Sequence, residues 1–276
     1  MHSAKPADRQ RLAFGVDPRR PQKYSLRQSR YFELGGDVAR LARQAKEQGR
    51  KLQFLDVGFA GGVSMRYIEA NDGAENIDFH GVDLKLQGHI YKRDHWSGLW
   101  EGDLMHGLPF LQSDRFDVVI CEQVLEHLDQ IDLAMSTLHR VLKPGGTLIV
   151  GVPIYPPGIH LIRRHLVPVM DRMFRRMPTM ARLLGAKTNR DHVQAFSKNS
   201  FINDLRRNTD LEIQQARGFR IISGGLLAPL ENLRAWWRMA RFVGSIVPGL
   251  CIEIQVVAQN PKTTAKPPST ASHAAA

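Results

Sequence analysis

The chain has 276 residues, 43% of them hydrophobic, which is enough to bury the core of one α/β domain with additional segments. Its formal net charge of +11 favours an anionic partner, such as a nucleic acid, a membrane surface or a phosphorylated molecule. The N-terminal residues lack a secretory signal, and no apolar run reaches the roughly 18–20 residues that cross a bilayer. We therefore expect a cytoplasmic protein.

The two cysteines indicate neither a metal site nor a disulfide. Cys121 and Cys251 both lie in apolar, strand-like runs, and their spacing matches no zinc or disulfide pattern. Small buried thiols in a reducing compartment explain them. The sequence predicts no metal site.

The N-terminal part divides into an arm and a helix. Residues 1–24 are polar, basic and dotted with proline, so we expect a flexible arm. In residues 25–49, Leu34 and Val38 recur at helical spacing and Gly49 follows as a stop signal. A helix is predicted there.

From residue 52 onward, apolar runs alternate with helical stretches, of which 130–142 has the clearest apolar face. Such alternation predicts a mostly parallel sheet covered on both faces. The predicted strands are 52–57, 77–83, 116–121, 147–152 and 250–258.

A glycine-rich turn follows the first predicted strand. Gly58 and Gly62 allow a sharp turn and a close approach to a ligand, beside the start of the next helix. Asp56 precedes this turn, where a carboxylate would oppose a pyrophosphate but suit a cationic ligand. Asp83 ends the second predicted strand, about where a carboxylate accepts hydrogen bonds from ribose hydroxyls. Together these residues favour a ligand site over a purely structural turn.

Residues 116–153 read FDVVICEQVLEHLDQIDLAMSTLHRVLKPGGTLIVGVP. Pro144 cannot continue a helix and Gly145–Gly146 provide a left-handed exit, so we expect the helix to end there before the next strand. With the glycine turn, this segment closely resembles the small-molecule (type 11) branch of class I methyltransferases. The resemblance covers residues 52–153. It implies an α/β, Rossmann-like, seven-stranded, mostly parallel sheet and the cofactor S-adenosylmethionine, whose sulfonium and ammonium groups match the sign expected at Asp56.

The resemblance also implies a role for each cofactor-binding position. One position departs from the family pattern, because the middle glycine of the turn is Ala60 here, and its methyl group would crowd the cofactor. The implied roles are these: Asp56, Gly58 and Gly62 line the methionine moiety, Asp83 binds the ribose, Asp103 reaches the adenine amino group beside Leu104, and Glu122 lies near the methionine end.

Two histidines are candidates for catalysis. His127, in the VLEHL turn, lies near the expected cofactor and could act as a general base for an oxygen acceptor, although local capping or packing explains it equally well. His192, in DHVQAFS, resembles a family segment that lines the acceptor side.

Two basic insertions, 155–190 and 224–248, are expected to form a helical cap within a methyltransferase domain that spans 25–259, and residues 260–276 to form a disordered tail. Their helical stretches combine arginines with apolar side chains, including Trp236 and Trp237. The simplest interpretation is a lid with solvated arginines. A lid that also contacts an anionic membrane surface, at the inner face of the membrane, is the second, and a nucleic-acid surface the third.

The sequence thus predicts an enzyme that transfers a methyl group from S-adenosylmethionine to a small or lipid-linked metabolite, favouring a hydroxyl of a sugar, quinone or natural product. An RNA-directed methyltransferase is the main alternative, but CEQV replaces the Asn/Asp-Pro-Pro-aromatic turn that clamps a flipped base. A nicotinamide-dependent oxidoreductase is opposed by Asp56. A catalytically silent cofactor-binding protein of the same fold is also open.

Overall fold

The computed structural model describes residues 29–155, 193–221, 230 and 233–262. The expected arm, nearly all of the first insertion, and His192 lie outside the described residues. No helix in the described ranges has the length and apolar character needed to span a membrane.

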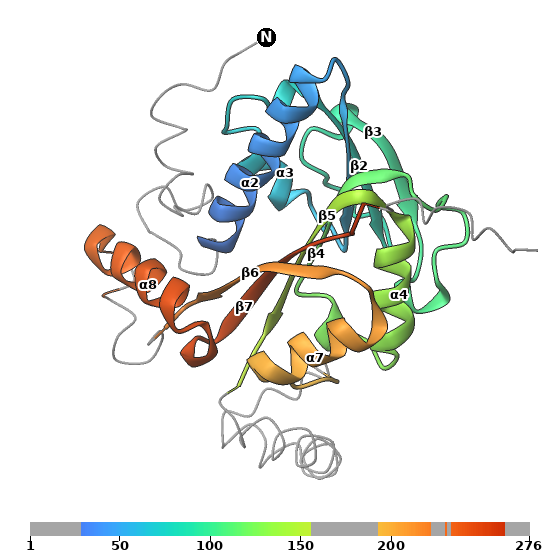
Figure 1. Cartoon of the computed structure of the whole chain (residues 1–276). Helices are drawn as coiled ribbons and strands as arrows, with labels where there is room; N and C mark the ends of the chain where they lie inside the picture. The colour runs from blue at the N-terminus through green and yellow to red at the C-terminus, as the bar shows by residue number, and fades with distance from the viewer. Residues whose placement is uncertain (1–28, 156–192, 222–229, 231–232, 263–276) are drawn as a thin grey trace, which may run out of the picture.

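Seven strands form one sheet in the order β3-β2-β1-β4-β5-β7-β6 (Figure 1). β7 runs antiparallel to its neighbours β5 and β6, and the pairs among β1 to β5 are parallel. The predicted seven-stranded, mostly parallel sheet is confirmed. The strands are β1 (Leu52–Val57), β2 (Ile77–Asp83), β3 (Trp96–Glu101), β4 (Phe116–Glu122), β5 (Leu142–Pro153), β6 (Glu212–Phe219) and β7 (Glu253–Gln259).

Helices cover both faces of the sheet. Alternate residues of a strand point to opposite faces, so Phe54 of β1 packs with Leu34, and Leu55 packs with Leu138. One face therefore carries α2 (Ser29–Glu47) and α3 (Val63–Ile68), and the other carries α4 (Ile131–Val141) and α7 (Lys198–Asn208). Short 3-10 helices, η2 (Ala74–Asn76), η3 (Arg93–His95), η4 (Leu104–His106) and η5 (Leu125–His127), lie in the connections.

The turn before β5 differs from the expectation. α4 ends at Val141, and Leu142 is already extended and pairs with Phe116. Lys143 to Gly146 are therefore part of β5 and carry an irregularity in its pairing with β4, and Gly145 is left-handed within the strand. The helix ends before Pro144 because extended pairing with β4 begins at Leu142.

Asn260, the residue that follows β7, packs against the start of β5. Asn260 is buried, and its side-chain nitrogen donates hydrogen bonds to the carbonyls of Leu142 and Lys143, both at 3.1 Å. Its backbone N–H donates to the carbonyl of Gly146. Asn260 therefore belongs to the fold, because it satisfies the backbone groups of the irregular start of β5.

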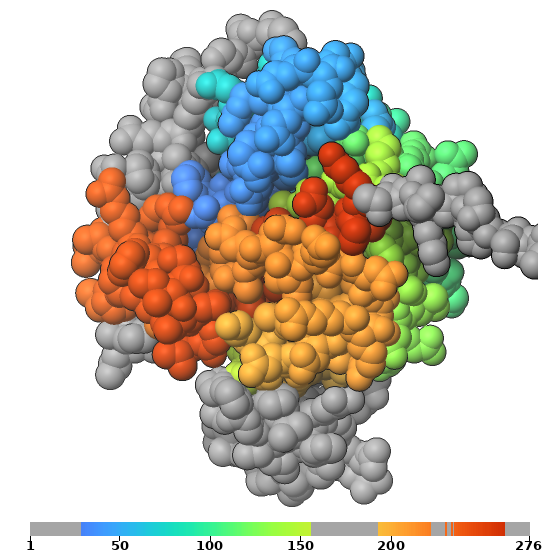
Figure 2. Space-filling model, in the orientation of Figure 1, coloured from blue at the N-terminus to red at the C-terminus, as the bar shows by residue number. Residues whose placement is uncertain are grey.

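The second predicted cap contains α8 (Arg234–Ile246) and the 3-10 helix η7 (Pro248–Leu250). Helix α8 lies at the β6 edge of the sheet (Figure 1). The space-filling view shows α8, in orange, next to the blue N-terminal part of α2 (Figure 2). Trp237 is buried and meets Phe32 edge-on, with ring centroids 5.5 Å apart. The expectation that the arginines of this segment are solvated is wrong for Arg241. Its guanidinium lies against Phe32 and Trp237 and pairs with Glu33. A helical face that packs on aromatic rings favours this cation–π position over solvent.

Candidate functional site

The carboxyl ends of β1, β2 and β4 meet at one edge of the sheet, where ligands bind in open α/β sheets. Gly58 follows β1 and donates its N–H to the carbonyl of Val82 at 2.8 Å. Its φ is +76°, and a Cβ there would lie 2.3 Å from Cγ2 of Val124, in the loop after β4. Only glycine fits, and the turns after β1 and β4 are thereby held in contact.

Asp83, at the end of β2, is tied to the glycine turn. Its Oδ2 accepts a hydrogen bond of 2.8 Å from the backbone N–H of Ala60. Ala60 is exposed and left-handed, with φ of +48°. A non-glycine residue in this conformation is strained, and the bond to Asp83 compensates. The predicted turn and acidic residue therefore form one unit.

Asp56 lies inside this edge and is almost completely buried. Burial raises the pKa of its carboxyl to about 7, although the hydrogen bond from the Ser64 hydroxyl acts in the opposite direction. No Lys or Arg pairs with Asp56 within the described ranges. Such a carboxyl gains most from a cationic ligand, which would favour its ionised form.

Glu122, the last residue of β4, is buried next to two long-range partners. Arg30, in the first turn of α2, places its Nε 3.1 Å from Oε2 of Glu122. Gln255 of β7 donates from Nε2 to Oε1 at 2.7 Å. Burial still raises the pKa of Glu122 to about 7, against the attraction of Arg30. Arg30 also donates to Glu253 of β7 at 2.8 Å.

The turn after β4 contains two buried polar atoms with no hydrogen-bond partner among the described residues. They are Nε2 of Gln123, a donor, and Oε2 of Glu126, an acceptor. Gln123 is left-handed, with φ of +59°, directly after the strand. Burial raises the pKa of Glu126 to about 8. Buried unsatisfied groups are rare in native proteins, and a strained turn that carries two of them is typical of a ligand site.

Of the two candidate catalytic histidines, His127 lies within the described residues. His127 is partly exposed, and its Nε2 lies 3.9 Å from Oε1 of Glu126. His192 is outside the described residues, but Val193 and Gln194 donate backbone hydrogen bonds to the carbonyl of Glu126, at 2.7 and 2.9 Å. The chain that follows His192 is therefore attached to the VLEHL turn.

Comparison with known proteins agrees with this geometry. Residues 55–150 match a family model described as a methyltransferase domain. A ubiquinone biosynthesis O-methyltransferase of Rickettsia felis is 27% identical over 172 residues, which cover 61% of this chain and 64% of the relative. The highly reducing polyketide synthase sorA of Penicillium rubens is 27% identical over 153 residues, 50% of this chain and 6% of the synthase. A Galdieria sulphuraria structure named as a sarcosine dimethylglycine methyltransferase aligns with a TM-score of 0.50 at 13% identity, covering 85% of this chain and 87% of that chain.

Residues 55–150 are a class I methyltransferase domain. The solved structure supports the fold alone, and the match spans less than two thirds of the Rickettsia protein. Methyltransferases of this class take S-adenosylmethionine as cofactor, and the donor set fits it. Asp56 is a buried carboxyl without a cationic partner among the described residues, and Asp83 presents a carboxylate at the carboxyl edge.

Three other predicted positions of the methyltransferase domain have local structural tasks. Asp103 caps η4 by accepting the N–H of Met105 at 2.9 Å, and its other oxygen lies 3.2 Å from Nδ1 of His106. The Leu104 side chain is buried in the core. Gly62 is left-handed at the start of α3, and a Cβ there would press against Trp96 rather than Asp56 or Asp83. Their cofactor roles stay predictions.

Sequence reasoning missed Gln123, Glu126 and Leu84. Leu84 directly follows Asp83, and 67% of its surface is exposed at the same edge. Once the strand is placed, the sequence shows a large apolar residue directly after its acidic end. Such an exposed side chain could pack against the adenine ring of the cofactor. No local sequence pattern marks Gln123 or Glu126 as functional, because their lack of a hydrogen-bond partner among the described residues appears only in the folded structure. The described residues contain no cluster of three or more His, Cys, Asp or Glu side chains arranged for a metal.

We expect Gly58→Ala to destabilise the methyltransferase domain far more than Gly49→Ala. Both positions are left-handed, with φ of +76° and +71°, but a Cβ at Gly49 meets nothing within 4 Å. Gly49→Ala should cost about 1 kcal/mol from backbone strain alone, and overpacking against Val124 should add about 1–3 kcal/mol at Gly58. Urea denaturation of the two variants measures the difference. Equal unfolding free energies would contradict the contact between the two turns.

Asp56 should make cofactor binding depend on pH. A raised pKa contributes stability to the free protein that is fully present below the unfolded pKa and is lost as pH rises through about 7. A cationic ligand needs the ionised form, so S-adenosylmethionine affinity should rise between about pH 6 and about pH 7.5. Asp56→Asn should lower the affinity about tenfold and flatten this dependence. Calorimetry checks both, with the exposed Asp210→Asn as control. A wild-type affinity that is flat with pH would contradict the assignment.

Proposed function

We propose that this protein transfers the methyl group of S-adenosylmethionine to a hydroxyl oxygen of a small molecule, either free or carried on a lipid. The observation that carries the proposal is the joining of the turns after β1, β2 and β4 at one edge of a class I methyltransferase sheet. Gly58, Asp83 and the buried Asp56 meet there, beside the unsatisfied Gln123 and Glu126.

The cofactor, when bound, supplies an already activated methyl group on its sulfonium. The chain then has to bind, orient and exclude water. Asp83 would accept hydrogen bonds from the ribose hydroxyls, and Asp56 would face the positive end of the methionine moiety. Asp103, beside Leu104, would lie toward the adenine, and Gly62 stays assigned to the turn. Glu122 would lie near the methionine end, where Arg30 and Gln255 fix its carboxyl.

Glu126 and His127 supply the proton chemistry that a hydroxyl acceptor needs. The Glu126 carboxyl has a pKa of about 8 and one oxygen without a partner among the described residues, so it can hold or accept a proton near physiological pH. His127 lies 3.9 Å from its other oxygen and is partly exposed, which suits passage of the proton to solvent. His192 stays the predicted acceptor-side residue from the sequence, and Val193, which follows it, donates its N–H to the carbonyl of Glu126.

The name of the Rickettsia relatives, ubiquinone biosynthesis O-methyltransferase, supports an oxygen acceptor. Because that match spans 64% of the relative, we do not extend the proposal to ubiquinone precursors themselves. An RNA acceptor would use the basic surface instead of Glu126, and a catalytically silent protein would bind the cofactor without turnover. One assay separates these three functions.

Glu126→Gln should abolish most of the turnover and leave cofactor binding unchanged. With S-adenosylmethionine and a panel of phenols and quinols, we expect release of S-adenosylhomocysteine to fall about 100-fold or more, as for loss of a general base. The wild-type rate should rise with pH through about 8, because the base acts when deprotonated, and the variant should lose that rise. The exposed Glu47→Gln is the matched control.

Three outcomes would count against the proposal. A Glu126→Gln variant with wild-type rate and pH profile would remove the residue from the mechanism. Methylation of total RNA but of no phenol or quinol would favour the RNA-directed alternative. Cofactor binding without turnover on any acceptor would favour the silent protein.

A further inference from the structure

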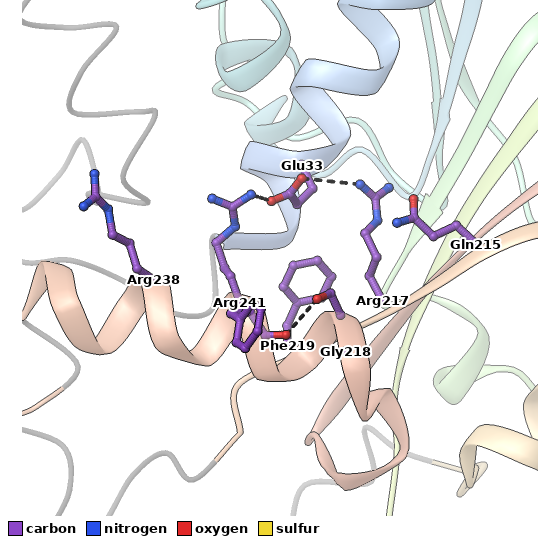
Figure 3. A pocket seen from close by; sticks show the side chains of 9 residues that line it. Glu33, Gln215, Arg217, Gly218, Phe219, Arg238 and Arg241 are labelled. Carbon is purple, nitrogen blue, oxygen red and sulfur yellow. Dashed lines mark hydrogen bonds and ion pairs between the residues drawn. The ribbon is translucent and has the colours of Figure 1, made fainter.

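A hollow of about 320 Å³ lies between α8, β6 and the first turns of α2 (Figure 3). β6 is the edge strand, so β5 and β7 separate it from the strands that carry Asp56, Asp83 and Glu122. This hollow, named the arginine pocket, therefore lies at the C-terminal end of β6, two strands away from the strands that carry the predicted cofactor residues. Its lining residues are Glu33, Gln215, Arg217, Gly218, Phe219, Arg238, Arg241, Phe242 and Ser245.

The arginine pocket carries excess positive charge. Three guanidinium groups line it, and Glu33 is its only acidic lining residue. Glu33 serves two of them, because one of its oxygens pairs with Arg241 and the other lies 3.5 Å from Nη1 of Arg217. Arg238 has no carboxylate partner among the described residues and is exposed on the same side of α8 as Arg241 (Figure 3). An anion would balance this third charge.

Two of the arginines are held rigidly and are incompletely satisfied. Arg241 lies 4.8 Å from the Phe32 ring centroid and 4.7 Å from that of Trp237, and burial lowers its pKa. Arg217 is buried and donates to Asp37 at 2.5 Å. The Nε atoms of both are buried and have no hydrogen-bond partner among the described residues. Guanidinium groups that are already fixed in place lose little entropy on binding an anion.

The surroundings of the pocket restrict its ligand. Phe242 borders it and is 67% exposed, and Ile246 and Leu250 beside it on α8 and η7 are also largely exposed. The volume admits a single small anionic group next to an apolar surface, and arginine forks match phosphate oxygens in geometry. The geometry points to a binding site for a phosphate ester. The exposed Arg238 side chain would adapt to the ligand, and Arg217 and Arg241 would form the fixed part of the site.

Two sources of a phosphate ester fit this chemistry, a soluble phosphorylated molecule and a phospholipid headgroup. The exposed apolar residues beside the pocket make the second source compatible with the membrane contact expected from the sequence. Glycerol 3-phosphate and vesicles of phosphatidylglycerol represent the two sources, and phosphatidylcholine vesicles control for apolar adsorption alone.

The test uses the full chain and three variants. Arg238→Gln removes the arginine without a described carboxylate partner, Arg238→Lys keeps its charge, and the exposed Arg206→Gln on α7 removes the same charge elsewhere. Thermal unfolding confirms that each variant is folded. We expect Arg238→Gln to weaken binding of the preferred probe about fivefold to tenfold at low salt, Arg238→Lys to weaken it less, and Arg206→Gln to leave it unchanged.

The outcomes distinguish the two sources of the phosphate ester and test whether the pocket binds one at all. Calorimetric binding of glycerol 3-phosphate that depends on Arg238 identifies a soluble phosphate ester. Co-sedimentation with phosphatidylglycerol vesicles alone, again dependent on Arg238, identifies a headgroup. If neither probe binds the wild type, the pocket is not a phosphate site. If Arg238→Gln and Arg206→Gln weaken binding equally, the surface acts only through its general charge, and the proposal is equally wrong.

Discussion

Three carboxyl groups buried at one edge of the sheet, those of Asp56, Glu122 and Glu126, constrain the structure around them. Burial raises the pKa of each to about 7 or about 8. Unbalanced buried charge is costly and is retained where function requires it. Arg30 pairs with Glu122, and no Lys or Arg pairs with Asp56 or Glu126 among the described residues. We propose that Asp56 faces the ligand together with Oε2 of Glu126, which has no hydrogen-bond partner in the described part of the chain.

The topology explains how so much charge gathers there. β7 runs antiparallel, so its first residue, Glu253, lies at the same edge as the carboxyl ends of β4 and β5. Arg30 from α2 and Arg220, just after β6, then bind the two oxygens of Glu253, at 2.8 and 2.7 Å. The antiparallel pair of β6 and β7 thereby connects the predicted cofactor edge to the region of α8.

Local patterns in the sequence were sufficient for the parallel core and for bringing Asp56, Gly58 and Asp83 to one edge of the sheet. The near-continuous apolar runs of β1, β2 and β4 and the turn around Gly58 were predicted at nearly the observed residues. β3 and β6 were not located, because an edge strand has one neighbour and tolerates polar residues such as those of EIQQARGF. Contacts between residues far apart in the sequence could not be predicted from local patterns either. Arg30 meets Glu253 across 223 positions, and nothing near Arg241 in the sequence indicates that it faces Phe32.

We propose that Asp83 holds the sugar of the cofactor where β2 ends. The most direct measurement is calorimetry of S-adenosylhomocysteine binding to the wild type, to Asp83→Ala and to Asp78→Ala, which truncates an aspartate at the opposite end of the same strand. Loss of charge-assisted bonds to the ribose should weaken binding to Asp83→Ala about 100-fold, while Asp78→Ala binds as the wild type does. Wild-type affinity in Asp83→Ala would contradict this account of the site.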